Sequence, residues 1–249
     1  YPSIFLKNYS PRPSIYGFWG LLNWGIVAYL YKAPRSIVIV HGWNYATHWL
    51  ALLAARCCGH LVCLRAETPA NQEVQRSPVK RMLRQLFFTF FFRPMVDFFL
   101  PIGSQNEQFY QLYKVPTTRL LTLPYAVDNA RFRREASQWA GDRDTLCAEW
   151  GIDPQRRIFL FVGKFMPKKR PLDLLKAYAL LAGSSGAALI MVGEGALRVE
   201  MEQFIQEKNL EQVVLTGFVN QGQIARYYAA ADVFVMCSEQ GETWGLAVN

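Results

Sequence analysis

The sequence predicts an α/β protein of two domains, each built on a parallel β-sheet covered by helices. Short runs rich in Val, Ile and Leu alternate with stretches of helical spacing along its 249 residues. Charge divides the chain in two: residues 1–134 carry 16 Lys and Arg against 5 Asp and Glu, whereas residues 135–249 carry 11 against 14. A composition that is 51% hydrophobic and 18% charged excludes disordered and low-complexity classes.

In the basic half, strands alternate with helices from residue 36 onward. The β-branched run at 36–41 predicts a buried strand, and a capping-box pattern at Ser104 and Glu107 predicts a helix start. The predicted strands are 36–41, 60–64, 98–102 and 119–123, and the predicted helices are 45–57, 78–92 and 104–113.

The second half alternates more regularly. Its predicted strands are 157–162, 187–192, 212–216 and 233–237, and its predicted helices are 170–181, 197–207 and 221–231. The polar residues 131–156, with one helix near 144–150, are predicted to link a domain at 1–130 to a domain at 157–249. We therefore expect two Rossmann-like domains with right-handed crossovers.

Ligands of open α/β sheets bind outside the carboxyl ends of the strands. The turns that follow the four late strands, at 163–171, 193–195, 217–219 and 238–246, are polar or contain glycine. The first turn holds Lys164, Lys168, Lys169 and Arg170, and a helix beginning near Trp244 would point its amino end at the same edge. These features predict a site for a phosphate-bearing ligand. No GxGxxG or GxxxxGK[ST] pattern occurs, which disfavours dinucleotide and P-loop sites.

Five ordered motifs in residues 157–249 resemble those of one enzyme family. They are FVGKF with Lys169, VGEG at 192–195, LTGFV at 215–219, YYAAADV at 227–233, and the stretch from Ser238 to Leu246, which resembles the start of an E-x7-E motif. The family is the retaining GT-B glycosyltransferases of group 4, which carry the glycosyl transferases group 1 domain. LPYAVDN at 123–129 resembles its interdomain motif.

The resemblance implies a GT-B fold, two Rossmann-like domains facing a cleft, here incomplete at both termini. It implies transfer of a sugar from a UDP- or GDP-type nucleotide sugar to a lipid-linked or polysaccharide acceptor with retention of configuration. No cofactor or metal is expected, since cations and backbone N–H groups can stabilise the diphosphate. A cytoplasmic location follows, and the five cysteines without a CxxC pair fit a reducing compartment.

The resemblance also implies roles for single residues. Lys164 and Lys169 would hold the donor diphosphate together with Gly163, Gly245 and Leu246, and Glu242 would contact the transferred sugar. The base and sugar pocket would be lined by Gly193, Glu194, Gly217, Phe218, Val219, Thr243 and Trp244. The sequence departs from the family pattern at three places. Lys164 replaces the usual arginine, and Arg170 and Pro171 follow Lys169 where the family usually has glycine. The second Glu of the E-x7-E motif would fall just after Asn249.

The catalytic histidine expected in the first domain is assigned to His41, because it ends a strand. A lone histidine at a strand end can also be structural, but His41 is preferred to His48, which falls inside a predicted helix, and to His60, which begins a strand. Arg65 and Glu67 also end a strand. They would either contact the acceptor side or form a surface ion pair.

Two apolar stretches, 19–31 and 86–100, are interrupted and too short for a spanning helix. They predict half-buried helices or, alternatively, an interfacial helix. The second option is suggested by basic residues that flank the Phe-rich run and fit an anionic membrane: Lys80, Arg81, Arg84 and Arg93.

Two other functions stay open: a nucleotide-sugar epimerase of GT-B build, and a non-catalytic nucleotide-sugar or membrane-binding protein. Nucleic-acid binding is not expected, as no recognised motif for it occurs.

Overall fold

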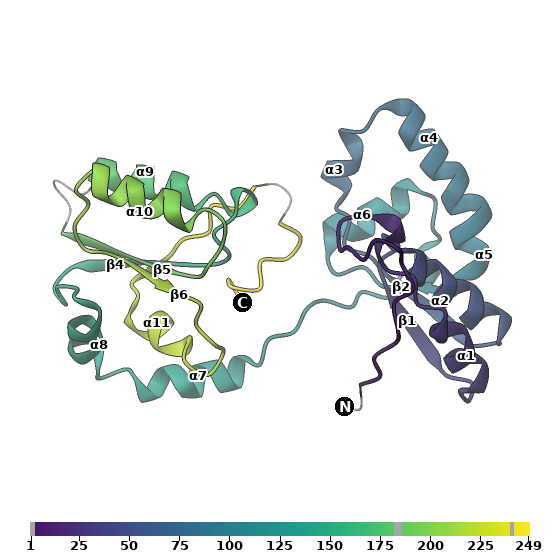
Figure 1. The fold of residues 1–249 in the computed structure, drawn as a ribbon, viewed down its shortest axis with the longest axis horizontal. Coiled ribbons are helices and arrows are strands. Elements are labelled where there is room, and N and C mark those ends of the chain that lie inside the picture. The colour runs from purple at the N-terminus through teal and green to yellow at the C-terminus, as the bar shows by residue number, and fades with distance from the viewer. Residues whose placement is uncertain (1–2, 182–185, 240–241) are drawn as a thin grey trace. The chain divides into compact units, whose positions relative to one another are not determined.

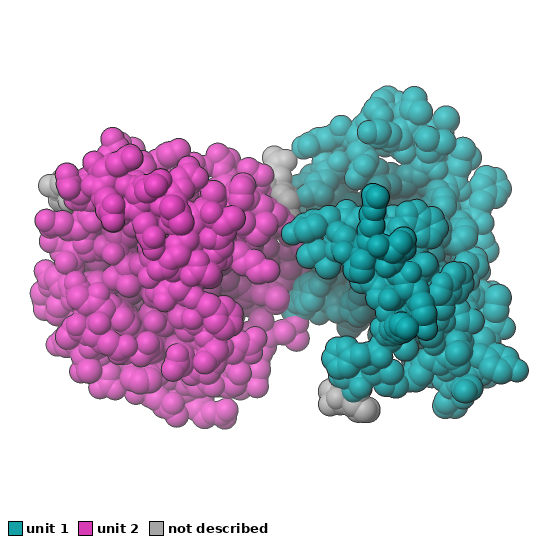
Figure 2. Space-filling model, in the orientation of Figure 1, with its two compact units in different colours: residues 1–125 teal, residues 126–249 magenta. Residues whose placement is uncertain are grey.

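The computed structural model describes residues 3–181, 186–239 and 242–249. The chain forms two compact units, Tyr1–Tyr125 and Ala126–Asn249 (Figure 2). The division lies after Tyr125, whereas the sequence placed a linker at 131–156. That stretch contains most of α7 (Asn129–Gln138) and all of α8 (Arg143–Trp150), which both pack on α11 (Ala225–Ala230) of the second unit. The polar composition reflects two surface helices rather than an extended linker.

The second unit is a parallel sheet between two helical layers (Figure 1). Its strands are β4 (Arg157–Val162), β5 (Ala187–Val192), β6 (Val213–Gly217) and β7 (Val233–Phe234), in the order β6-β5-β4-β7. Alternate side chains of each strand point to opposite faces. Ile158 and Leu160 pack with α8 and α11, whereas Phe161 packs with α9 (Pro171–Leu181) and α10 (Arg198–Glu207). The predicted α/β fold with parallel sheets is confirmed.

The first unit also has a parallel sheet. Its strands are β1 (Ile37–His41), β2 (Leu61–Arg65) and β3 (Phe98–Phe99), in the order β1-β2-β3, and α2 (Ala46–Cys57) packs on β1 and β2. The strand predicted at 119–123 is reduced to a single bridge between Phe99 and Leu120, because a 3₁₀ turn (Thr117–Arg119) takes up its beginning.

The remaining helices of the first unit surround this sheet. They are a 3₁₀ turn (Phe18–Gly20), α1 (Gly25–Lys32), α3 (Ala70–Val74), α4 (Pro78–Phe87), a π-turn (Phe88–Phe92), α5 (Arg93–Met95) and α6 (Ser104–Leu112). Ser104 is the first helical residue of α6 and Gly103 takes the cap position, so the predicted capping box does not form. In the described ranges no helix is both long and apolar enough to cross a membrane.

Candidate functional site at the carboxyl edge of the second sheet

The strand order of the second unit reverses at β4, because β5 pairs with one side of it and β7 with the other. Such a switch point is where open α/β sheets form a binding crevice. The loop after β4 and the segment after β7 are the two that flank it. Within the predicted turn 238–246, residues 240 and 241 lie outside the described residues.

Backbone hydrogen bonds tie the predicted turns together. The Gly163 amide donates to the Val192 carbonyl at 2.9 Å, and the Gly193 amide donates to the Gly217 carbonyl at 3.0 Å. A Cβ atom on Gly193 would lie 1.9 Å from the Gly163 carbonyl oxygen, and its φ is +152°. Only glycine tolerates this approach, so the VGEG motif is a packing requirement of the sheet edge.

Lys169 and Glu242 meet across the switch point as an ion pair between half-buried side chains. The two segments are also joined by their backbones, since the Glu239 amide donates to the Lys168 carbonyl at 3.0 Å. Burial raises the pKa of Glu242, but the hydrogen bond and charge of Lys169, with the nearby Ser238 hydroxyl and Lys168, outweigh it and lower that pKa overall. Glu242 is therefore a carboxylate at neutral pH, held beside a cation.

The other basic residues of the loop after β4 do not join this pair. Lys164 is exposed. Arg170 has a left-handed backbone, with φ +50°, and its guanidinium pairs with Asp173 at 2.5 Å. The left-handed backbone explains why glycine would suit this position.

The predicted base and sugar pocket is only partly assembled. The Glu194 carboxylate pairs with Arg198 at 2.8 Å and lies beside Gly217, where an added Cβ would be 3.6 Å from Glu194 Oε2. Phe218 is 82% exposed, whereas Val219 packs against the core. The structure thus brings Glu194 and Gly217 together and turns Val219 inward.

The helix predicted from Trp244 is a turn in the structure. Its two backbone bonds run from Val248 to the Gly245 carbonyl and from Asn249 to the Leu246 carbonyl. Gly245 has φ +74°, and a right-handed helix cannot pass through that conformation. Thr243 and Trp244 are half-buried, and Leu246 lines a cavity of about 520 Å³ that also borders Val162, the last residue of β4.

The carboxyl edge of the first sheet carries two histidines. His41 pairs in register with Arg65, and the Gly42 amide donates to the Arg65 carbonyl at 2.7 Å. His48 lies against Gly42, and burial, with a smaller contribution from His41, lowers the pKa of His48. Sequence reasoning set His48 aside because it is helical. The signal it missed is that α2 begins at Ala46, so His48 lies in the first turn after the β1 loop.

Arg65 and Glu67 converge on one tyrosine. The Arg65 guanidinium lies 4.2 Å from the centroid of the Tyr125 ring, and the Tyr125 hydroxyl donates to Glu67. His60 is buried, and its two ring nitrogens lie at hydrogen-bonding distance from the Leu30 carbonyl and the Ser36 amide, so it is structural. Arg65, Glu67 and Tyr125 thus form a polar cluster next to His41.

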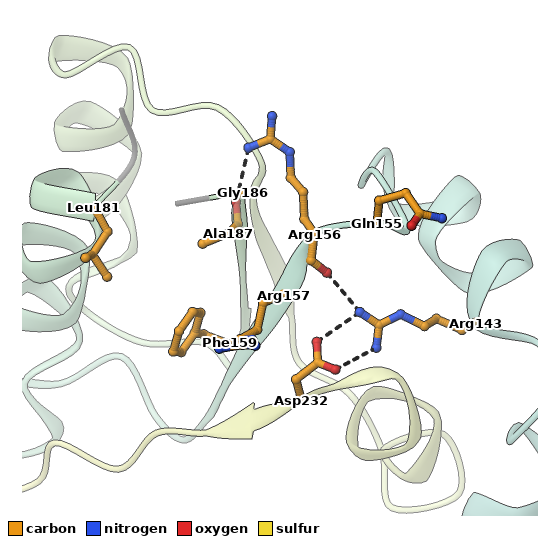
Figure 3. A pocket seen from close by; sticks show the side chains of 9 residues that line it. All are labelled: Arg143, Gln155, Arg156, Arg157, Phe159, Leu181, Gly186, Ala187 and Asp232. Atoms are coloured by element: carbon orange, nitrogen blue, oxygen red, sulfur yellow. Dashed lines mark hydrogen bonds and ion pairs between the residues drawn. The ribbon is translucent and has the colours of Figure 1, made fainter. Parts of the chain in front are cut away.

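A pocket of about 640 Å³ at the opposite, amino edge of the second sheet holds Arg143 and Asp232 (Figure 3). Arg143 forms two hydrogen bonds to Asp232, at 2.9 and 3.2 Å (Figure 3). Asp232 also accepts a hydrogen bond from the Ile158 amide at 2.7 Å. Asp232, which belongs to the YYAAADV motif, therefore holds the start of β4 in place and does not serve a ligand. Among the described residues, no group of three or more His, Cys, Asp or Glu is arranged to hold a metal ion.

Residues 142–249 match the family model described as Glycosyl transferases group 1. D-inositol 3-phosphate glycosyltransferase of Segniliparus rotundus is 30% identical over 55% of this chain and 30% of its own length. An N-acetylgalactosaminyltransferase of Campylobacter jejuni that acts on a diphospho-undecaprenol-linked sugar is 27% identical over 77% of this chain and 48% of its own length. The chain thus spans less than half the length of these relatives.

The fold also resembles a solved structure, HepE of Anabaena in complex with UDP and glucose. That structure matches with a TM-score of 0.64 and 14% identity, over 90% of this chain and 58% of the other. The likeness at this identity concerns the fold.

Proposed function

Residues 142–249 belong to the glycosyl transferases group 1 family, and on that premise we propose that the protein transfers a sugar from a nucleotide-sugar donor to a lipid-linked or polysaccharide acceptor. The donor we propose is of the UDP or GDP type, and the transfer retains the anomeric configuration. The resemblance of the motifs to retaining enzymes supports retention, and the names of relatives that act on lipid-linked sugars or diacylglycerol support the acceptor class.

The observation that carries the proposal is the Lys169–Glu242 pair at the switch point of β4 and β7. A diphosphate competes with the Glu242 carboxylate for the Lys169 ammonium, because both are anions. Once Lys169 binds phosphate, Glu242 is free to accept hydrogen bonds from sugar hydroxyls. Lys169 then stabilises the charge that develops on the leaving diphosphate, with Lys164 reaching the same group from the exposed start of the loop.

On the acceptor side we propose His41, Arg65 and Glu67, to which the structure adds His48 as a neighbour of His41. His48 is neutral near pH 7 because its pKa is lowered, so it can accept a proton from a hydroxyl group. We further propose that the reaction takes place on the cytoplasmic side of a membrane, where lipid-linked acceptors are presented.

Transfer is favoured over the two alternatives. The two relatives named above are transferases, and neither name describes an epimerase or a binding protein. An epimerase would invert a carbon of the donor sugar in the absence of any acceptor, whereas a binding protein would leave the donor intact.

The proposal is tested with radiolabelled UDP-glucose, UDP-N-acetylglucosamine and GDP-mannose, each mixed with the chain and a bacterial lipid extract. We expect label to move from one donor into lipid, with the linkage shown by NMR to keep the donor's anomeric configuration. Glu242→Gln should lower the rate by about 10²-fold or more, whereas Glu239→Gln, an exposed carboxylate of the same segment, should leave it unchanged. Equal rates for the two variants would contradict the role of Glu242.

A further inference from the structure

The outer face of α4 in the first unit is apolar although it is exposed. Val79, Met82, Leu83, Leu86 and Phe90 recur every three or four residues, which places them on one side of the helix and its π-turn. All five are exposed, Phe90 at 74%, and no residue of α4 is buried. Contiguous exposed apolar groups of this kind mark interaction surfaces.

This stripe points away from the core of its own unit. The residues that the same segment buries are Phe88 and Phe92, and Phe87 and Phe91 pack partly against the same core. At about 100° per residue, Phe88 lies about half a turn from Val79 and Phe90 around the helix axis. This segment therefore has two apolar sides: one that faces the core and the exposed stripe.

The charges beside the stripe are all positive. Between Glu73 and Asp97 the sequence contains five basic residues and no acidic one. Arg76 and Arg84 are drawn to the buried Glu73 carboxylate, at 3.1 and 2.5 Å, while Lys80 is exposed. At about 100° per residue Lys80 lies next to the stripe, whereas Arg81 lies on the opposite side of the helix. An apolar stripe with a cation at its border complements an anionic lipid surface.

An aromatic pocket of about 380 Å³ adjoins the stripe. It shares Leu83 with the stripe, and its other lining residues are Trp43, Trp49, Arg84, Phe87, Phe88 and Phe92. The Trp49 indole N–H donates to the Trp43 carbonyl at 2.7 Å, so this tryptophan presents only carbon to the pocket. The Trp49 ring also contacts Phe18, which contacts the exposed Trp19, and tryptophans of this kind suit a membrane–water interface.

We propose that this α4 face, defined by the five stripe residues and the adjoining pocket, docks on a bilayer that contains anionic phospholipid. The apolar stripe enters the acyl boundary, Lys80 lies among the lipid phosphates, and the pocket takes a segment of one acyl chain. The inference deepens the proposed function, because a lipid-linked acceptor lies in such a bilayer. Docking is nevertheless measured without donor or acceptor, so it succeeds or fails independently of catalysis.

The test is co-sedimentation of the whole chain with vesicles of phosphatidylcholine alone or mixed with phosphatidylglycerol. We expect binding to the mixed vesicles that weakens with salt. Removing the charge that borders the stripe with Lys80→Gln should weaken binding about fivefold. Leu83→Glu should weaken it about tenfold or more, since a buried leucine is lost. Leu180→Glu, at an 87% exposed leucine of the second unit, is the matched control and should have no effect.

Vesicles with brominated acyl chains test the pocket. They should quench tryptophan emission, and the double substitution Trp43→Phe and Trp49→Phe should remove most of the quenched emission, with circular dichroism confirming that each variant is folded. Equal binding to neutral and anionic vesicles would overturn the proposal, as would unchanged binding of Leu83→Glu. A chain that ignores vesicles but forms dimers that Leu83→Glu abolishes would show that the face joins two copies instead.

Discussion

The carboxyl edges of the two sheets differ in how they are built and in which groups they display. At the second sheet the strand order reverses at β4, glycine turns lie against one another, and an ammonium meets a carboxylate. At the first sheet the described strands follow in chain order, and the edge displays His41, Arg65 and a half-buried His48. The first edge thus displays two imidazoles and a guanidinium, and the second an ammonium paired with a carboxylate.

The difference teaches that the same α/β architecture is specialised by a few non-local contacts at one edge. The second edge depends on close backbone approach, so it should tolerate almost no change in side-chain size. The first edge leaves ordinary van der Waals space around Gly42, where an added Cβ would lie 3.7 Å from the His48 ring. Four substitutions, from the largest expected effect to the smallest, test how close backbone approach, buried charge and backbone conformation stabilise the two units.

Gly193→Ala should lower the free energy of unfolding by about 3–5 kcal/mol, because it combines a backbone clash with an unfavourable φ. Gly42→Ala, its counterpart at the first edge, has φ +90° without a clash and should cost about 1–2 kcal/mol. Urea unfolding measures both values. Equal losses would contradict the claim that close approach distinguishes the second edge.

Glu73→Gln should cost about 2–4 kcal/mol, because it leaves Arg84 facing a neutral group inside the first unit. Glu73 is 1% exposed and accepts hydrogen bonds from Arg76, Arg84 and the Tyr113 hydroxyl. Thermal unfolding followed by circular dichroism reports the loss. Glu107→Gln, a control on the more exposed surface of α6, should stay within about 0.5 kcal/mol.

Asp232→Asn should cost about 1–2 kcal/mol at neutral pH by weakening the link to Arg143 and β4. The hydrogen bond from Arg143 lowers the pKa of Asp232. Burial opposes this with a smaller upward contribution, and the hydrogen bond from the Ile158 amide lowers the pKa further. A carboxyl whose pKa is lowered on folding stabilises the protein above its unfolded value, and that stabilisation is lost as pH falls through the folded pKa. Urea unfolding at several pH values should therefore show the gap to wild type closing below about pH 4. A constant gap would contradict the ionic link.

Arg170→Gly should raise the stability of the second unit by about 0.5–1 kcal/mol, since Arg170 has φ +50°. Lys114→Gly is the matched change in the first unit, because Lys114 has φ +55°. Differential scanning calorimetry should show a small upward shift for both. A loss of stability for Arg170→Gly alone would mean that its ion pair with Asp173 outweighs the relief of backbone strain.

The sequence predicted the elements of the second unit better than their arrangement. β4 and β5 have the predicted bounds, because each is a six-residue run dominated by large or β-branched apolar groups that pack against helices on both faces. The order of the strands could not be predicted from the sequence, because β4 and β7 pair although they are far apart along the chain. The same holds for the contact of Lys169 with Glu242, which lie 73 residues apart.

The first unit was harder to predict because tertiary contacts override its local signals. The helix predicted at 78–92 divides into α4 and a π-turn, in which Phe88, Phe91 and Phe92 pack on the core whereas Phe90 is exposed. The burial of Glu73 depends on groups from α4 and the end of α6, which no local pattern brings together. His48 was missed for a related reason, since its neighbours come from the end of β1.

The most direct measurement of the central claim is the affinity of the chain for UDP and GDP by isothermal titration calorimetry, with wild type, Lys169→Met and Lys176→Met. Lys176 is an exposed lysine of α9 and serves as the matched control. If the switch point between β4 and β7 holds the donor diphosphate, Lys169→Met should weaken binding of the preferred nucleotide about 10–100-fold, as expected for a charged hydrogen bond, and Lys176→Met should leave it within about twofold. Equal affinity of Lys169→Met and wild type would contradict the account.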